Sequence, residues 1–187
     1  MKKEYRNVIR TKKMIRNAFI ELLEEKIEIG KISVQELIER ADLSKSTFYY
    51  HYNDIYAVAE EFENELIIKL SEILDRIKIE KAKNFDCYIQ NILDFLADNE
   101  SIYKKVIRAS SPKLFIEKLK VLLSKKIFED ADEKYFSADS RIRYVQIRFL
   151  TNACVDTIVD YFRDSFDLSL QELGKIIASY LNSYKNF

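Results

Sequence analysis

Few residues in this chain could carry catalysis through an imidazole or a thiol. The 187 residues include a single histidine, His51, and two cysteines, Cys87 and Cys154. One imidazole excludes a His-Glu-x-x-His zinc site, and no carboxylate stands at the Glu-x-x-His spacing of a metal site in a helical bundle. We therefore expect no catalytic residue, no metal site and no cofactor, and an enzyme is the least favoured function class.

The two cysteines stand 67 positions apart, and no Cys-x-x-Cys motif is present. In a chain of this size the spacing predicts two buried thiols in a reducing compartment, with a disulfide or a redox pair as the alternative. No apolar run approaches the roughly 18 residues of a membrane-spanning helix. We expect a soluble, cytoplasmic protein that has no membrane partner.

The residues best suited to binding a ligand lie in one short segment, 45–52. Most of them are polar or aromatic, and two aromatic positions among them are expected to face the core. Phe48 and Tyr52, four residues apart, would hold one helix face against a core. The other face would present hydrogen-bond donors, acceptors and rings, which are the groups that read base edges in a DNA groove. These residues are Lys45, Ser46, Thr47, Tyr49, Tyr50 and His51. The alternative is a small three-helix packing unit whose polar face contacts only solvent.

The elements that must position this segment are helices. Apolar residues recur at i, i+3, i+4 and i+7 almost throughout, and no strand with a period of two and no internal repeat is found. Ser33 with Glu36, and Ser169 with Glu172, form capping boxes that open two of the helices. The pattern predicts an all-α fold of about nine helices, with the first at 9–26, the second from 33, the third at 44–52, the fourth at about 54–78, three between 85 and 126, the eighth at 139–163 and the ninth from 169.

The low glycine content and the distribution of charged residues exclude some classes of function and favour others. With 2 glycines and 1 proline, the chain has no glycine-rich phosphate loop and no dinucleotide fingerprint. The formal net charge is zero, but residues 1–16 carry seven bases against one acid and residues 54–75 carry seven acids against one base. The basic arm suits a polyanion, or else it is a solvated terminus. A second basic cluster, at 104–126, is expected to line the outer face of a helix.

The stretch from Thr11 to about Val58 resembles the DNA-binding domain of the TetR/AcrR family of transcriptional regulators. The resemblance rests on the segments TKKMIRNAFIELLEEK and KISVQELIERADLSKSTFYYHYND. It implies a helix-turn-helix DNA-binding domain at residues 1–53 and a helical regulatory and dimerisation domain at residues 54–187. It also implies a cytoplasmic regulator, most often a repressor, that binds a palindromic operator as a homodimer and is released by a small-molecule effector.

Carried over onto this sequence, the resemblance assigns base or groove contacts to the start of the third helix and phosphate contacts to the residues around it. The expected DNA-binding residues are Arg10, Lys12, Ser33, Val34, Ser44, Lys45, Ser46, Thr47, Tyr49, Tyr50 and His51. Three positions depart from the family pattern. Asp42 replaces a glycine in the turn, Ile55 replaces a phosphate-binding lysine, and the glycine after the first helix comes late, at Gly30.

For the C-terminal region the resemblance implies a dimer interface on the last two helices and an effector cavity among helices four to eight. The expected interface residues are Ile158, Tyr161, Phe162, Leu173, Gly174, Ile177, Ala178 and Leu181. The expected cavity residues are Phe62, Leu66, Leu93, Leu96, Tyr103, Ile107, Phe115, Leu119, Tyr144, Arg148 and Cys154. Each of the cavity residues could instead belong to the core. Arg148 is expected to pair with Asp156 or Asp160 on the dimer partner or a neighbouring turn, or to meet an anionic effector.

Two alternatives stay open at this point. The C-terminal region could dock a partner protein and have no small-molecule cavity. Gly174 and Ala178, one helical turn apart, could allow close approach of two helices, or Gly174 could merely be tolerated.

Overall fold

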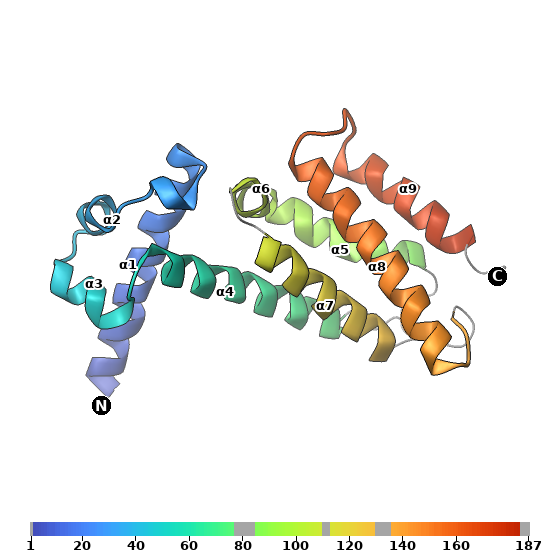
Figure 1. The fold of residues 1–187 in the computed structure, drawn as a ribbon, viewed down its shortest axis with the longest axis horizontal. Coiled ribbons are helices and arrows are strands. Elements are labelled where there is room, and N and C mark those ends of the chain that lie inside the picture. The colour runs from blue at the N-terminus through green and yellow to red at the C-terminus, as the bar shows by residue number, and fades with distance from the viewer. Residues whose placement is uncertain (1, 77–84, 110–112, 130–135, 184–187) are drawn as a thin grey trace. The chain divides into compact units, whose positions relative to one another are not determined.

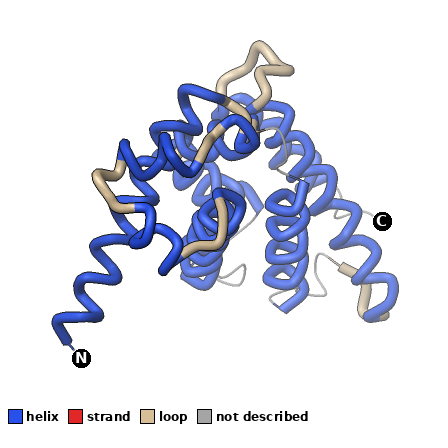
Figure 2. Tube along the Cα trace, turned by 60° about the vertical axis from the view of Figure 1, so that its left-hand side comes forward, coloured by secondary structure: helices blue, strands red, loops and turns tan. Residues whose placement is uncertain are grey.

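The computed structural model describes residues 2–76, 85–109, 113–129 and 136–183. All of its regular structure is helical, and no strand occurs in these four segments (Figure 2). The prediction of an all-α protein is confirmed. The elements, labelled in Figure 1, are α1 (Lys2–Lys26), the short 3₁₀ turn η1 (Ile29–Lys31), α2 (Val34–Arg40), α3 (Lys45–His51), α4 (Ile55–Arg76), α5 (Phe85–Asp98), α6 (Glu100–Arg108), α7 (Lys113–Glu129), α8 (Ser140–Phe162) and α9 (Leu170–Ser183).

Side-chain caps begin these helices where the sequence predicts them. Ser33 Oγ accepts a hydrogen bond from Glu36 N at 3.2 Å, and Glu36 Oε2 accepts from Ser33 N at 3.1 Å. Ser169 and Glu172 form the second capping box, with distances of 2.8 and 3.2 Å. The first helix begins at Lys2, seven residues before its expected start at Ile9. The expected end of the fourth helix, Lys78, lies outside the described residues.

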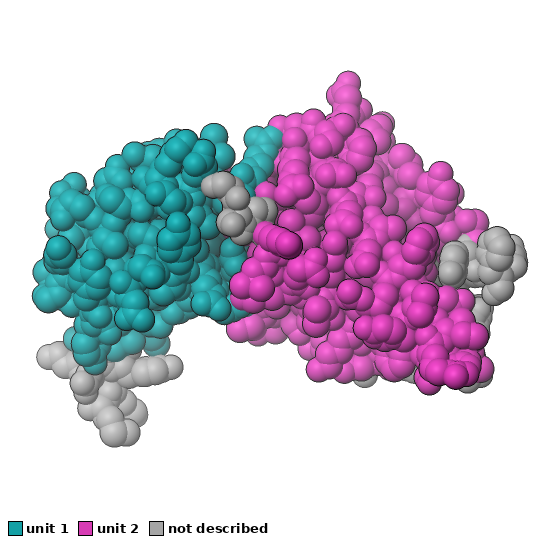
Figure 3. Space-filling view, in the orientation of Figure 1, with its two compact units in different colours: residues 1–66, 108–112 teal, residues 67–107, 113–187 magenta. Residues whose placement is uncertain are grey.

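The chain divides into two compact units (Figure 3). Unit 1 comprises residues 1–66 and 108–112, and unit 2 comprises residues 67–107 and 113–187. The division falls within α4 and not at its start, because the first three turns of α4 belong to the core of unit 1. Phe62, for example, is 6% exposed, and its ring lies 6.1 Å from that of Phe19 on α1.

Three helices end at a residue with left-handed backbone, and none of these residues is a glycine. The φ angles are 64° at Ile27, 51° at Asp42 and 57° at Asp164, whereas neither glycine has a positive φ. Asp42 N donates to Glu39 O and Leu43 N donates to Ile38 O, which is the pairing of a Schellman motif. Aspartate tolerates this conformation, but a β-branched residue such as Ile27 is strained in it. Ile27 therefore takes the place after α1 that the family gives to glycine.

In unit 2, α5 packs against α9 and α7 packs against α8. Gly174 allows the α5–α9 contact, because an added Cβ there would lie 1.9 Å from Leu93 Cδ1. The basic cluster at 104–126 is more than a solvated face, since several of its lysines form ion pairs within unit 2. Lys104 pairs with Asp164 at 2.8 Å and Lys120 pairs with Asp156 at 2.7 Å. Lys126 pairs with Asp75.

Candidate functional site

Helices α2 and α3 form a compact pair joined by a four-residue turn. The left-handed Asp42 ends α2, and Ser44 begins α3 by accepting a hydrogen bond from Thr47 N at 3.1 Å. Each helix is only seven residues long. Because a helix of two turns is marginal on its own, the caps and the buried face must hold α3 in place.

The two faces of α3 differ as the spacing predicts. Phe48 is completely buried, and Tyr52, which ends the helix, is 7% exposed. On the other side Tyr49 is 49% exposed and Tyr50 is 77% exposed. Lys45 and Ser46 are also exposed, while Thr47 and His51 are half-buried. The structure thus brings the predicted α3 residues together on one surface that offers an ammonium, hydroxyls and rings.

The two serines that begin α2 and α3 have their side chains engaged in capping. Ser33 Oγ also donates to Glu36 Oε2 at 2.9 Å, and Ser44 Oγ lies within 2.9 Å of the hydroxyls of Ser46 and Thr47. Both serines are exposed and Val34 is half-buried. Their location at helix N-termini is compatible with a phosphate contact through backbone N–H groups.

Lys12, which was expected to bind DNA, has a partner within the protein. Its Nζ lies 3.0 and 2.7 Å from the two carboxylate oxygens of Glu61 and 5.3 Å from the centre of the Tyr52 ring. One turn further along α1, Arg16 Nη1 donates to Glu65 Oε2 at 2.7 Å. The basic and acidic segments that cancel in the net charge therefore meet in part between α1 and α4. Arg10, by contrast, is exposed.

These charges also act on the end of α3. The pKa of His51 is lowered, first by burial and then by the positive charge of Lys12. The pKa of Tyr52 is raised, first by burial and then by the neighbouring Glu61 carboxylate, which accepts a hydrogen bond from the phenol. His51 is consequently neutral at pH 7, so any contact that it makes with a phosphate is a hydrogen bond and not an ion pair.

The start of α4 offers a residue that sequence reasoning missed. Ile55, at the position of the family's lysine, is 5% exposed and cannot reach a phosphate. Its neighbour Tyr56 is 60% exposed, and a Cβ built on Gly30 would lie 3.4 Å from the Tyr56 hydroxyl. The helical period could have found Tyr56, because Ile55, Val58 and Ala59 define the buried face and Tyr56 falls outside it.

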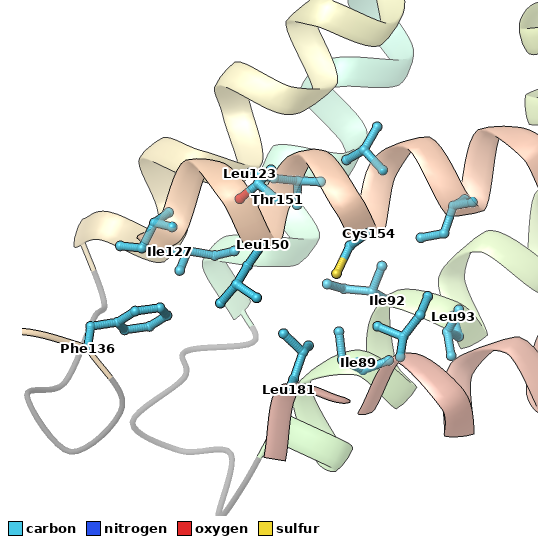
Figure 4. Close-up of a pocket in the computed structure, with 14 residues that line it drawn as sticks. Ile89, Ile92, Leu93, Leu123, Ile127, Phe136, Leu150, Thr151, Cys154 and Leu181 are labelled. Carbon is cyan, nitrogen blue, oxygen red and sulfur yellow. The ribbon is translucent and has the colours of Figure 1, made fainter. Parts of the chain in front are cut away.

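Unit 2 contains an apolar cavity with a volume of about 60 Å³. It is bounded by α5, α7, α8, α9 and Phe136. Figure 4 shows Leu150 and Cys154 of α8 pointing toward Ile89 and Leu181. Of the 14 lining residues, 12 have pure hydrocarbon side chains and the other two are Thr151 and Cys154. A second cavity, of about 40 Å³, shares the walls Ile92, Leu123, Val155 and Ile158 with the first.

The predicted effector residues are divided among several places. Leu93 and Cys154 line the first cavity, and Leu96, Tyr103, Ile107 and Leu119 line the second. Phe62 and Leu66 are buried in unit 1, and Phe115 is buried in the core of unit 2, so these three belong to packing. Tyr144 and Arg148 lie in an outer groove between α7 and α8. Within the protomer, Asp156, one expected partner of Arg148, pairs with Lys120.

Most of the predicted dimer residues lie inside the protomer. Phe162, Leu173, Gly174, Ile177, Ala178 and Leu181 are all buried without a partner chain. The five on α9 are core residues, because α9 packs against α5, and Phe162, the last residue of α8, stacks on the buried Tyr103 with ring centres 6.4 Å apart. Ile158 is a wall of both cavities, and Tyr161 donates a hydrogen bond to Glu100 at 3.1 Å. The exposed large hydrophobic residues of the last two helices are Ile142, Tyr144, Val145, Phe149, Ile176 and Tyr180.

The described thiol, Cys154, is half-buried and is not a reactive group. Cys154 is a free thiol, and burial raises its pKa to about 11, so it is protonated at neutral pH. The side chain of Cys87 lies outside the described part of the chain. Within that part, no cluster of three or more histidine, cysteine, aspartate and glutamate residues could hold a metal ion, and no helix is both long and apolar enough to cross a membrane.

Known proteins that resemble this chain are regulators of transcription, which are not enzymes. HTH-type transcriptional regulator YxbF of Bacillus subtilis is 30% identical over 80 residues, which are 42% of this chain and 20% of that protein. A TetR transcriptional regulator from Streptococcus agalactiae superposes with a TM-score of 0.70 at 24% identity, covering 95% of this chain and 97% of the other. The dihydroxyacetone kinase operon activator DhaS superposes with a TM-score of 0.60 at 21% identity, covering 92% and 94%.

A family model covers most of unit 2. The model TetR_C_8, described as a transcriptional regulator C-terminal region, matches residues 83–183. This is more than half of the chain, and it includes all of α5 to α9. Together with the capped α2–α3 pair, this match identifies the chain as a member of the TetR family of transcriptional regulators.

Proposed function

We propose that this protein is a repressor that binds a palindromic operator as a homodimer, reads it with α3 and releases it when a small molecule binds unit 2. TetR-family regulators bind DNA and act as dimers. The observation that supports the proposal for this chain is the exposed face of α3, where Lys45, Ser46, Tyr49 and Tyr50 are held outward by the buried Phe48. A helix of this kind, with exposed residues at its N-terminus, fits the major groove.

The division of roles that we propose on and around α3 is the one that the resemblance to the family implies. Lys45, Ser46, Thr47 and Tyr49 read base edges from α3. Tyr50, His51, Arg10 and the exposed Tyr56 contact phosphates, and the helix N-termini at Ser33 and Ser44 add backbone N–H donors. Tyr56 would supply the contact at the start of α4 that the buried Ile55 cannot make.

Binding of the purified protein to genomic fragments tests this proposal. Selection should enrich fragments with a palindromic site, and the affinity should fall steeply as salt concentration rises. Tyr49→Ala should relax base preference, at a cost of about 1–3 kcal/mol at one position. Tyr50→Ala should weaken all sequences alike, and Lys175→Ala on α9 serves as a control. No salt-dependent binding to any fragment would contradict DNA binding as the function.

The proposed dimer contact uses the outer face of α8 and not the residues expected from the sequence. Ile142, Val145 and Phe149 are 52%, 65% and 66% exposed, and their i, i+3, i+7 spacing is that of a helix–helix seam. Ile176 and Tyr180 add an exposed apolar strip on α9. Phe149→Asp should convert the dimer to a monomer in light scattering. Ile68→Asp, on the exposed side of α4, should leave the mass unchanged.

The effector proposed here is a small, uncharged, apolar molecule in the first cavity. Burying a charge there without a partner would cost several kcal/mol, because every lining side chain is apolar or weakly polar. Straight-chain alcohols should raise the melting temperature, whereas carboxylates of the same length should not. Cys154→Leu, which fills the cavity, should abolish that rise, and Cys154→Ala should keep it. Equal stabilisation by both ligand series would contradict an apolar site.

A second candidate function has its own supporting feature. The outer groove between α7 and α8, lined by Val121, Phe128, Tyr144 and Arg148, has a volume of about 400 Å³. Such an exposed groove suits a partner protein that docks on unit 2. DhaS is an activator, so the fold is compatible with either sign of regulation. Val121→Asp should abolish partner-dependent regulation under this alternative and leave effector release intact under the first proposal.

A further inference from the structure

Glu61 occupies the point where α1, α3 and α4 meet in unit 1. Its carboxylate accepts both hydrogen bonds of the Lys12 ammonium, at 3.0 and 2.7 Å, and a hydrogen bond from Tyr52. Tyr52 directly follows His51, the last residue of α3. One acidic side chain on α4 therefore holds the end of the proposed reading helix and a lysine of the basic arm.

This contact is one rung of a repeated pattern. Lys12 pairs with Glu61 and Arg16 pairs with Glu65, so that both partners are separated by 49 residues. We call these two pairs the charge ladder. The side chains of Lys12 and Glu61 are 37% and 36% exposed, so water and ions can reach the pair. An ammonium in such a position can exchange a carboxylate for another anion, because neither group is sealed away from solvent.

We propose that Glu61 competes with a DNA phosphate for Lys12, so that the Lys12–Glu61 pair sets the DNA affinity of the free protein. The proposal rests on the proposed DNA-binding function. A phosphate oxygen and a carboxylate oxygen accept the same three N–H donors of lysine, and both are anionic. Binding of DNA at this point breaks the pair, and the free energy of the pair is lost from the affinity.

A double-mutant cycle on the full-length chain tests the proposal. Glu61→Gln removes the charge but keeps an acceptor for Tyr52. On a fragment selected by the wild-type protein, Glu61→Gln should bind about two- to fivefold more tightly at low salt, the range expected from breaking one exposed pair. In a Lys12→Gln background the same change should have no effect. Glu72→Gln, an equal change of charge on an exposed part of α4, should leave the affinity within about twofold.

Three results would overturn the proposal. Weaker binding by Glu61→Gln would mean that Glu61 is only a scaffold for α3. A gain as large for Glu72→Gln would reduce the effect to net charge, and a gain that survives Lys12→Gln would exclude the competition. A melting temperature of Glu61→Gln close to that of the wild type guards against a folding defect. Absence of DNA binding by the wild-type protein would instead overturn the proposed function.

Discussion

Phe48 in unit 1 and Tyr103 in unit 2 are both aromatic residues with almost no exposed surface, at 0% and 1%, but their surroundings differ. Phe48 lies under a short helix, with Tyr49 and Tyr52 against its ring at 5.3 and 6.0 Å. Tyr103 borders the second cavity, and its buried hydroxyl has no hydrogen-bond partner among the described residues. Phe48 therefore packs against neighbouring rings, while Tyr103 lines a cavity.

The two units differ in the same way as these two residues. In unit 1, local caps and ion pairs hold the helices, as at Ser33, Ser44 and Lys12. In unit 2, two apolar cavities share four walls, and the buried hydroxyls of Thr151 and Tyr103 lack partners. A surface that reads DNA needs side chains held in one geometry, whereas a core that responds to a ligand needs room to change.

Of the variants that test this difference between the units, Phe48→Ala should change the free energy of unfolding the most. Because Phe48 is completely buried, its truncation should lower the free energy of unfolding by about 3–5 kcal/mol. Chemical denaturation monitored by circular dichroism measures it. Phe48→Leu, which keeps most of the apolar volume, should cost less than about 1.5 kcal/mol. A small loss for Phe48→Ala would mean that the core of unit 1 can collapse as readily as that of unit 2.

Adding a methyl group at each glycine compares the two units directly. A Cβ at Gly174 would lie 1.9 Å from Leu93 Cδ1, so Gly174→Ala should cost about 1–3 kcal/mol in the same denaturation experiment. Leu93 lines the first cavity and can turn into it, which favours the lower end of this range. At Gly30 the nearest atom would be 3.4 Å away, and Gly30→Ala should be within about 0.5 kcal/mol of neutral.

Removing one phenol oxygen should have opposite signs in the two units. Tyr103→Phe deletes a buried hydroxyl without a partner and should stabilise the protein by about 1 kcal/mol. Tyr52→Phe deletes a hydroxyl that donates to Glu61 and should destabilise it by about 1 kcal/mol. Thermal unfolding of both variants gives the comparison. Destabilisation by Tyr103→Phe would show that this hydroxyl is satisfied in solution.

The left-handed helix ends provide a smaller comparison. Ile27→Gly should stabilise the protein by about 0.5–1 kcal/mol, because a β-branched residue at a φ of 64° is strained and glycine is not. Asp164→Gly in unit 2, at a φ of 57°, should gain less, since aspartate tolerates this region. Urea denaturation midpoints of the two variants resolve the order, and an equal gain at both sites would contradict the argument from branching.

Acid should affect the two capping boxes unequally. Hydrogen bonds from Lys26 and then from Ser33 lower the pKa of Glu36 from 4.5 to about 2. A carboxyl group with a lowered folded-state pKa stabilises the protein above its unfolded value, and this contribution is lost as pH falls from about 4.5 toward 2. Glu36→Gln should therefore flatten the acid side of the melting-temperature profile. Glu172→Gln should flatten it less, because Glu172 lacks a hydrogen-bonded lysine, and the reverse order would contradict this cause.

Residues whose neighbours are close in the chain were predictable, and those whose neighbours are distant were not. The Ser33–Glu36 box, the Ser44 cap and the buried Phe48 follow from spacings of three or four residues. The charge ladder pairs residues 49 positions apart. Its signal was present, since Lys12 and Arg16, and likewise Glu61 and Glu65, stand four residues apart and face the same way on their helices.

The apolar face of α9 shows what helical periodicity cannot predict. Leu173, Ile177 and Leu181 have the apolar period of a packed helix, and that period is equally compatible with a core and with a dimer interface. Only the packing of α9 against α5 assigns them to the core and leaves Ile176 and Tyr180 exposed. The predicted effector residues likewise lie in several different places. Apolar residues at helical spacing indicate a buried face, but they do not reveal where a cavity remains beside it.

By itself the sequence determined the helical fold, the helix-turn-helix, the capped helix starts and the absence of glycine-dependent sites. These follow from local periodicity, hydrogen bonds within one turn and the backbone freedom of each residue type. Only the tertiary structure decided that Lys12 is held by Glu61, that α9 is buried against α5 and that a cavity remains among α5, α7, α8 and α9. Each of these depends on which surfaces of distant helices meet, and a one-dimensional pattern does not contain that information.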